Sequence, residues 1–299
     1  MRSTMSTVAS FADRLFDAVE RTDCRVVLGF DPWIDRIPGE LRTSGAQAKD
    51  PESTARLFGA FGREVIGLVA GRVPAIKVQI AFFEELGPAG LRVYSELLGV
   101  AREAGILTIG DIKRGDIGST AGAYAKAHTG TGPFAADAVT VSPYFGRDSV
   151  APFAAGPERG VFVLVRTSNP SAPTFQDLEV DGRPLYEHVA LEVGRWGQDR
   201  GASGYSSIGA VAGATYPREL GRIRSLLPHT PLLVPGFGAQ GATAKDVAEA
   251  FDGKGLGAIV NASRSLLYAH EKTEGSWKDA LLGALETSRT AINEAIRAR

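Results

Sequence analysis

Short apolar runs rich in β-branched residues recur along the chain, and each is followed by a stretch with apolar residues at helical spacing. In "STARLFGAFGREVIGLVAG" and "LRVYSELLGVAREAG", for example, apolar positions recur every three or four residues with charges between them. Strands that alternate with helices pair in parallel. Eight such units predict an α/β fold, a single closed (β/α)8 TIM barrel, although the count alone also allows an open sheet. We expect the eight strands near residues 24–31, 74–80, 106–113, 138–144, 161–168, 207–215, 231–238 and 257–264.

Two segments interrupt this alternation and predict extra loops after the first and fifth strands. "PGELRTSGAQAKDPEST" (residues 38–54) is polar and contains Pro and Gly. "NPSAPTFQDLEVDGRPL" (residues 169–185) is longer than the usual strand-to-helix connection, which makes it a candidate substrate cover or interface. Neither segment resembles a domain boundary, so we expect one catalytic domain over residues 1–299.

The composition narrows the classes of partner. The chain has 299 residues, of which 44% are hydrophobic, and a net charge of -1 with its 33 basic residues spread along the sequence. It therefore carries no electrostatic footprint for nucleic acid or an anionic membrane surface, and no stretch approaches a membrane span. Cys24 is the only cysteine, which excludes an internal disulfide and a multi-thiolate metal site. We expect a cytoplasmic protein that binds a small molecule, with no nucleic-acid or membrane partner.

The segment "GDIKRGDIGST" places charges at the spacing D-x-K-x-x-D directly after an apolar run. Alternation along the third strand places Asp111 and Lys113 on one face, towards the barrel mouth where active sites of such barrels lie. Lys77 ends the preceding strand in the same direction, and Asp116 follows in the turn. These charges predict an alternating Lys-Asp-Lys-Asp array, which is either a structural ion network or a preorganised electrostatic site. The gathering of polar groups at several strand ends favours the second interpretation.

The glycine-rich segment "PGFGAQG" (residues 235–241) follows the seventh strand and satisfies the dinucleotide-binding pattern G-x-G-x-x-G. The context argues against that function, because too few residues follow for a dinucleotide fold and Asn261 stands where an acid is required. A phosphate site is the better interpretation, since the loops after the last two strands of such barrels often bind phosphate. Backbone N–H groups of this segment and of Ser263 would hold the phosphate oxygens, with Gln240 and Arg264 as further donors.

The remaining polar residues give weaker signals. The four histidines fall in predicted helices or loops away from the strand ends: His128, His188, His229 and His270. The sequence therefore indicates neither a histidine base nor a metal site. Ser168 and Asn169, at the end of the fifth strand, either contact the polar edge of a heterocycle or cap the turn before Pro170.

In combination, these motifs resemble the orotidine 5'-phosphate decarboxylase family. The resemblance runs from about Asp31 to Arg264 and includes D-x-K-x-x-D after the third strand and a lysine after the second. "VAGATYP" after the sixth strand, "PGFGAQG" after the seventh and an arginine after the eighth complete it. The segments "KVQIAFFE", "VRTSNP" and "NASRS" are similar to the longer bacterial subgroup of that family, often called type 2.

The resemblance implies a role for each matching residue. The catalytic set would be Lys113, Asp111, Asp116 and Lys77, and the substrate-binding set would be Asp31, Thr120, Ser168, Pro235, Gln240 and Arg264. Asp31 would hold ribose hydroxyls with Lys77, Ser168 would contact the pyrimidine edge, and the last three residues would contact the phosphate. Asp116 and Thr120 would reach into the site of the neighbouring subunit of a homodimer. Many relatives have glycine where this chain has Ser263, which leaves the local backbone geometry open.

The implied reaction is decarboxylation of orotidine 5'-monophosphate to uridine 5'-monophosphate (UMP) and CO2, the last step of de novo pyrimidine biosynthesis, without a metal or other cofactor. Magnesium-dependent sugar-phosphate decarboxylases and aldolases share the barrel and the D-x-K-x-x-D motif. They generally carry an acidic metal ligand where this chain has Lys77, and a lysine there repels a cation. The third possibility is a non-catalytic sensor of phosphate ligands, which would be expected to have lost a member of the charged array.

Overall fold

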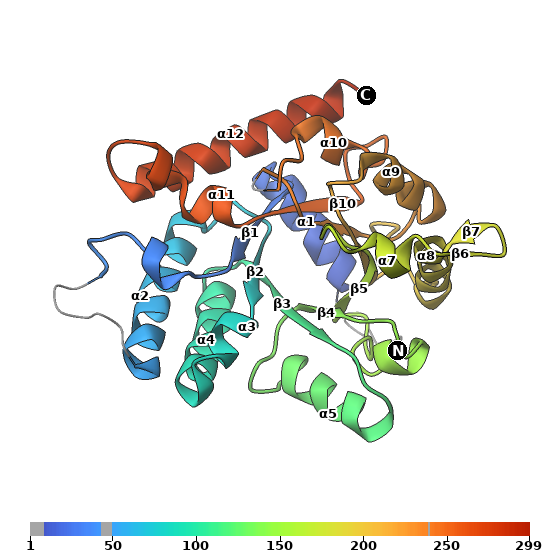
Figure 1. The fold of residues 1–299 in the computed structure, drawn as a ribbon, viewed down its shortest axis with the longest axis horizontal. Helices are drawn as coiled ribbons and strands as arrows, with labels where there is room; N and C mark the ends of the chain where they lie inside the picture. The colour runs from blue at the N-terminus through green and yellow to red at the C-terminus, as the bar shows by residue number, and fades with distance from the viewer. Residues whose placement is uncertain (1–8, 43–49, 239) are drawn as a thin grey trace, which may run out of the picture.

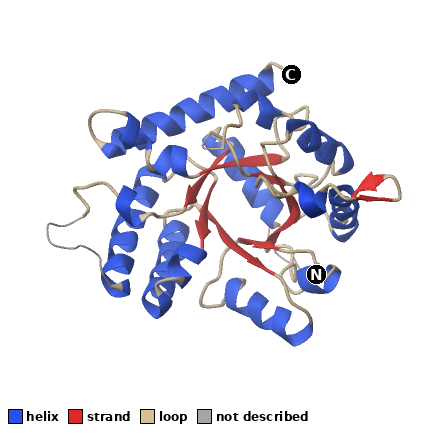
Figure 2. Cartoon of the chain, in the orientation of Figure 1, coloured by secondary structure: helices blue, strands red, loops and turns tan. Residues whose placement is uncertain are grey.

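Eight parallel strands close into a barrel in the computed structural model, which describes residues 9–42, 50–238 and 240–299. The order around the ring is β1-β10-β9-β8-β5-β4-β3-β2, and helices surround it (Figure 2). The barrel strands are β1 Val26–Phe30, β2 Ala75–Gln79, β3 Leu107–Arg114, β4 Ala138–Val141, β5 Gly160–Arg166, β8 Ile208–Ala212, β9 Leu232–Val234 and β10 Ala258–Ala262. The predicted TIM barrel and its eight strands are confirmed, and the pairing of β1 with β10 excludes the open sheet.

Helices form the outer layer (Figure 1). They are α1 Phe11–Thr22, α2 Pro51–Val69, α3 Ala81–Glu84, α4 Gly87–Glu103, α5 Gly118–His128, α6 Arg147–Val150, α7 Pro173–Gln176, α8 Leu185–Trp196, α9 Pro217–Leu226, α10 Ala244–Ala248, α11 Arg264–Leu267 and α12 Trp277–Arg297, with 3-10 helices η1 Ile34–Arg36 and η2 Ala269–Lys272. In α2, Phe58, Phe61 and Val65 recur at helical spacing and are buried in the core around the barrel. The helix begins after Asp50, whose side chain accepts a hydrogen bond from the Ser53 N–H.

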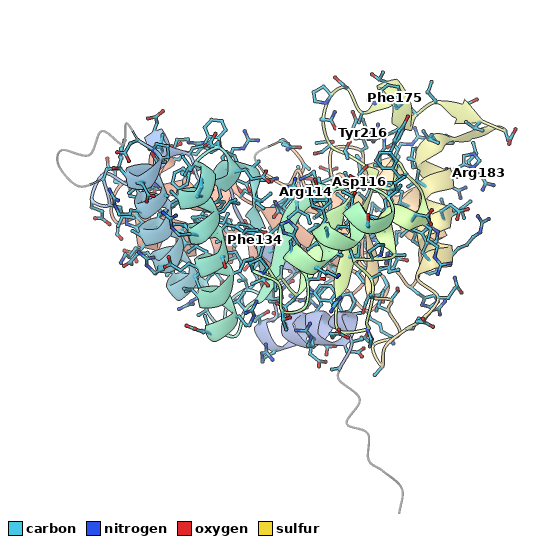
Figure 3. The ribbon with its side chains drawn as sticks, turned by 90° about the horizontal axis from the view of Figure 1, so that it is seen from below. Arg114, Asp116, Phe134, Phe175, Arg183 and Tyr216 are labelled. Atoms are coloured by element: carbon cyan, nitrogen blue, oxygen red, sulfur yellow. The ribbon has the colours of Figure 1, made fainter. Side chains whose placement is uncertain are left out.

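A second apolar cluster fills the barrel and extends to its amino-terminal face. Strand residues such as Val27, Ile109 and Phe162 point inwards and join Phe11 and Leu15 of α1. This helix lies across the bottom of the barrel in Figure 3. Because apolar side chains close this end, the polar groups of the strands can meet a ligand only at the opposite, carboxyl-terminal end.

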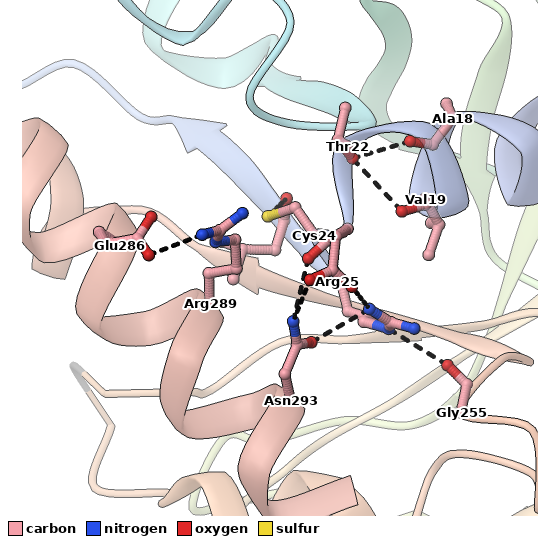
Figure 4. Close-up of polar contacts among 11 residues, drawn as sticks. Ala18, Val19, Thr22, Cys24, Arg25, Gly255, Glu286, Arg289 and Asn293 are labelled. Carbon is pink, nitrogen blue, oxygen red and sulfur yellow. Dashed lines mark hydrogen bonds and ion pairs between the residues drawn. The ribbon is translucent and has the colours of Figure 1, made fainter. Parts of the chain in front are cut away.

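Polar contacts join the last helix, α12, to the amino-terminal end of the barrel (Figure 4). Asn293 of α12 donates to the Asp23 carbonyl, which follows α1, and its Oδ1 accepts from Arg25 at 3.1 Å. Arg25 also donates to the Gly255 carbonyl, in the turn before β10. These bonds join the first and last helices to the strands where the barrel closes.

The two predicted extra segments lie where the sequence places them, after β1 and after β5. In the first, residues 43–49 lie outside the described residues. The second is not a plain loop, because it contains α7 and a two-stranded antiparallel sheet of β6 Glu179–Val180 and β7 Arg183–Pro184. Within the described ranges, no helix is both long and apolar enough to cross a membrane.

Candidate active site

A cavity of about 500 Å³ opens at the carboxyl ends of the barrel strands. Its lining includes eight of the ten residues that the sequence assigns to the site: Asp31, Lys77, Asp111, Lys113, Ser168, Pro235, Gln240 and Arg264. These residues lie in or follow six different strands, so the closure of the barrel is what brings them together. Asp116 and Thr120 do not line the cavity of their own chain.

The centre of the cavity is a chain of alternating charges around Asp111. Lys77 Nζ lies 2.5 Å from Asp111 Oδ2 and 3.9 Å from Asp31 Oδ1, and Lys113 Nζ contacts Asp111 Oδ1. Lys77 and Asp111 are both buried, whereas the Lys113 side chain is 47% exposed to the cavity. Three members of the predicted array, Lys77, Asp111 and Lys113, therefore meet within one chain, and the fourth charge there is Asp31 instead of Asp116. Lys113 is the member that a ligand in the cavity can reach.

Mutual attraction keeps the two buried members of this array ionised. Burial alone would raise the pKa of Asp111, but the ammonium groups of Lys77 and Lys113 outweigh burial and hold this pKa well below its usual range. Burial would likewise lower the pKa of Lys77, yet Asp111 and Asp31 raise it above its ordinary value. The cavity thus presents fixed charges that need no rearrangement to act on a substrate.

The backbone at Lys113 departs from the regular strand that the alternating pattern predicts. Lys113 has a φ of 45°, and the pairing of β3 with β4 shifts register between Gly110 and Arg114. Asp111 and Lys113 still share the cavity, as predicted, while Ile112 faces the outer core. A residue other than glycine with a positive φ at the end of a strand indicates local backbone strain of the kind found at functional sites.

The glycine-rich segment after β9 forms the opposite wall of the cavity. Gly236, Gly238 and Gly241 have φ values of 104°, 70° and 93°. These positive values explain why glycine stands at each position of this tight turn. Gln240 and Arg264 face the cavity from this loop and from the start of α11. Among the described residues, no carboxylate pairs with Arg264. An unpaired guanidinium beside a glycine loop is a suitable site for phosphate, whereas the barrel around it leaves no place for a dinucleotide fold.

Ser168 and Asn169 line the cavity between the charged array and the glycine loop. The Ser168 carbonyl accepts a hydrogen bond from Thr215 Oγ1, and Asn169 Oδ1 accepts one from Thr167 Oγ1. A Cβ atom at Gly236 would lie 3.5 Å from the Ser168 Cβ, so the two walls approach closely here. Both side chains can therefore contact a ligand, and Asn169 is also oriented by its own turn.

Several cavity residues were missed by sequence reasoning, chiefly Trp33, Thr140, Phe237 and Asn261. Thr140 had a detectable signal, because it is a lone hydroxyl residue within an otherwise apolar strand. Asn261 was noted only as an argument against a dinucleotide site. Ser263 has a φ of -110° and a ψ of -83°, which is neither helical nor extended, and its Oγ accepts from Asn261 Nδ2. Because its φ is negative, this position does not require glycine.

Asp116 and Thr120 lie outside the cavity, at the start of α5. The Asp116 carboxylate (Figure 3) accepts only a local bond from the Ile117 N–H in the described chain, and Thr120 is exposed. Ile117, next to Asp116 in the sequence, is an exposed large apolar side chain, and so are Tyr144 and Phe145 after β4, where Phe145 lies beside Gly115. In the part of the chain that the structure describes, no three His, Cys, Asp or Glu side chains gather in a way that could hold a metal ion.

Comparison with known proteins agrees with this site. The model of the family described as "Orotidine 5'-phosphate decarboxylase / HUMPS family" matches residues 49–278. An orotidine 5'-phosphate decarboxylase from Rhodopirellula baltica is 46% identical, covering 92% of this chain and 96% of the relative. One from Clostridium perfringens is 42% identical, covering 95% and 99%. The solved structure of Leishmania donovani OMP decarboxylase has a TM-score of 0.76 at 32% identity, covering 96% and 99%. The chain therefore belongs to the orotidine 5'-phosphate decarboxylase / HUMPS family.

Proposed function

We propose that the cavity binds orotidine 5'-monophosphate and converts it to UMP and CO2 without a cofactor, as the last step of de novo pyrimidine biosynthesis. The observation that carries this proposal is the reachable Lys113 ammonium in the fixed charge array, opposite the glycine loop and Arg264, which pairs with no carboxylate among the described residues. The names of the curated relatives support the same reaction. The magnesium-dependent alternative fits less well, because the Lys77 cation occupies the position of an acidic metal ligand.

The chemistry follows from the charges. Breaking the bond between C6 and the carboxylate leaves an electron pair on C6, in the ring plane and orthogonal to the π system. Ring resonance cannot spread this charge, so fixed cations must stabilise it. Lys113 stabilises the carbanion and transfers an Nζ proton to C6, which yields UMP. Asp111 lies beside the leaving carboxylate, and Lys77 and the partner subunit's Asp116 keep Lys113 oriented.

The other cavity residues hold parts of the substrate that do not react. Asp31 and Lys77 bind the ribose hydroxyls, and Ser168 contacts the pyrimidine edge. The phosphate is bound by Pro235, Gln240 and Arg264. Because the phosphate is remote from C6, its binding energy can drive closure of the glycine loop and so contribute to turnover as well as to affinity.

A homodimer completes the site in this proposal. Asp116 and Thr120 lie outside their own cavity, and exposed Ile117, Tyr144 and Phe145 give the adjacent surface an apolar character that suits a subunit contact. Each subunit then contributes Asp116 and Thr120 to its neighbour. The whole chain acts as one catalytic domain, and its single, buried, free Cys24 supports a cytoplasmic location.

The direct test is an absorbance assay with orotidine 5'-monophosphate on protein treated with EDTA. We expect UMP to form, and added magnesium to leave the rate unchanged. If folded protein converts this nucleotide only when magnesium is supplied, or instead acts on a sugar phosphate, the proposed reaction is wrong. Binding of UMP without any turnover would support the sensor.

A further inference from the structure

Thr140 lies opposite the irregular part of β3, in the middle of β4. Gly110 pairs with Val139 and Arg114 pairs with Val141, so residues 111–113 face the single residue Thr140. A regular parallel ladder cannot serve all the backbone groups of such a bulge, and unpaired buried N–H groups are costly. Thr140, which is 1% exposed, supplies the hydrogen-bond partner that the ladder lacks here.

The Thr140 hydroxyl makes three hydrogen bonds at this point. Its oxygen accepts from the N–H groups of Ile112 at 3.0 Å and Lys113 at 3.1 Å. Its own proton is donated to Asp111 Oδ1 at 2.9 Å, because an ionised carboxylate can only accept. One side chain thus fixes the Asp111 carboxylate and the backbone of Lys113 together.

This arrangement holds Lys113 in a backbone conformation that lysine rarely adopts. Lys113 has a φ of 45°, in the left-handed region, which is unfavourable for residues other than glycine. Such a conformation persists only where the surroundings enforce it. The two hydrogen bonds that Thr140 Oγ1 accepts act directly on the peptide units at either side of Ile112, and so on the direction in which the Lys113 side chain leaves the strand.

We infer that Thr140 is a positioning residue that sets the distance between the Lys113 ammonium and the Asp111 carboxylate. The inference rests on the proposed function, because it assumes that Lys113 delivers the proton to C6. Thr140 lines the cavity but carries no charge, and its action on the reaction is exerted through its two neighbours in β3.

The chain offers a matched control at the other end of the same two strands. Thr108, fully buried near the start of β3, also joins a carboxylate to a backbone N–H group. Its Oγ1 donates to Asp137 Oδ2 at 2.8 Å and accepts from the Asp137 N–H at 3.0 Å. Thr108 lies at the amino-terminal end, away from the cavity, so Thr108→Val removes comparable hydrogen bonds without touching the site.

The test compares Thr140→Val, Thr140→Ser and Thr108→Val for decarboxylation, UMP binding, melting temperature and amide hydrogen exchange. We expect Thr140→Val to lower kcat about 10- to 100-fold, the usual effect of a lost hydrogen bond to a charged group, with UMP affinity nearly unchanged. Thr140→Ser should restore kcat. Thr108→Val should lower the melting temperature but not kcat.

Two outcomes would overturn the inference. One is a kcat of Thr140→Val within about twofold of wild type, a change of less than about 0.5 kcal/mol. The other is a parallel loss of kcat, UMP affinity and melting temperature, which would indicate only a structural role. Amide exchange separates this inference from the proposed function. If the wild type does not decarboxylate the nucleotide, faster exchange at Ile112 and Lys113 in Thr140→Val still supports the positioning role, and unchanged exchange contradicts it.

Discussion

The buried pair of Lys77 and Asp111 is an expensive feature for a protein core. Removing two charges from water costs several kcal/mol, and well-packed apolar side chains would often stabilise the fold as well. Asp111 has a second cation at Lys113 and a hydroxyl donor at Thr140, so all its interactions favour the ionised form. This concentration of charge is best explained by its use on a substrate, since the stability of the barrel does not require it.

His128 shows a different consequence of burial, at the end of α5. It is 4% exposed, its ring lies 5.5 Å from the ring of Phe134, and its Nδ1 has no hydrogen-bond partner among the described residues. Burial, with a smaller contribution from the Arg114 cation, lowers the pKa of His128 to about 4 from an ordinary value of 6.5.

A pH-dependent loss of stability follows from this shift. Because the unfolded state binds a proton more readily, the neutral His128 stabilises the fold fully above pH 6.5 and loses this effect as the pH falls towards about 4. The free energy of unfolding should drop by up to about 3 kcal/mol over that interval on account of this group. Urea unfolding of wild type and His128→Gln at several pH values checks it. If the free energy of unfolding changes equally with pH in the two proteins, His128 is not the cause of the pH dependence.

At this scale the sequence predicted which residues meet but not how they are held. Strand ends with charged residues identified Lys77, Asp111 and Lys113 as neighbours. The positive φ of Lys113 and the role of Thr140 depend on a register shift between two strands, and periodicity carries no information about such a shift. Residue type alone likewise could not distinguish a hydroxyl that serves packing from one that bridges a carboxylate and a bulge.

Among the elements, the insertion after β5 (residues 169–185) holds the end of that strand in place. Arg166, at the end of β5, is 1% exposed, and its guanidinium stacks 4.0 Å from the ring centroid of Tyr216. It donates to Asp177 Oδ2 at 3.1 Å, immediately after α7. Gln176 accepts from the Thr167 N–H at 2.9 Å. The insertion therefore stabilises the end of β5, and the residues that follow this end, 167–169, line the cavity.

We expect Asp177→Asn to loosen this strand end. Loss of the ionised partner of a buried arginine should lower the free energy of unfolding by about 2 kcal/mol. It should also weaken UMP binding roughly tenfold, which corresponds to about 1.4 kcal/mol. Calorimetric titration and urea unfolding measure both effects. Asp181→Asn, the same change in the exposed turn between β6 and β7, is the matched control and should alter neither quantity.

An unchanged UMP affinity in Asp177→Asn would mean that the insertion stabilises the fold without shaping the cavity. The sequence identified this segment as unusually long, but it could not assign a contact between Arg166 and Asp177 across a turn of irregular backbone. The strands and main helices, by contrast, follow from hydrophobic periodicity, because each must bury one face.

Over the whole molecule, the two ends of the barrel have separate tasks. Helix α1 closes the amino-terminal end, where Asn293 also joins α12 to Asp23, and the charged array lies at the other end. Sequence reasoning predicted the position of the charged residues, because strand-end residues have a fixed place in a parallel barrel, but it did not predict how the other end is closed. The resemblance to the family implies that Asp116 and Thr120 act outside their own subunit, and their position outside the cavity agrees with that hypothesis. The assembly itself remains a prediction.

The most direct measurement of the central claim is subunit complementation between Lys113→Ala and Asp116→Asn. Each variant alone should be inactive on orotidine 5'-monophosphate. In a mixed dimer, one site combines an intact Lys113 with the partner subunit's Asp116. Equal mixing makes about half of the dimers mixed, each with one working site of two, so about a quarter of wild-type activity should return.

The matched control mixes Lys113→Ala with Asp111→Asn, whose defects both lie in the site of their own subunit. No mixed dimer then contains an intact site, and we expect no recovery. Recovery only in the first mixture would establish that Lys113 and the partner's Asp116 act in one shared decarboxylation site. Absence of recovery there, with subunit exchange verified by mass spectrometry, or full activity of either single variant, would contradict the account.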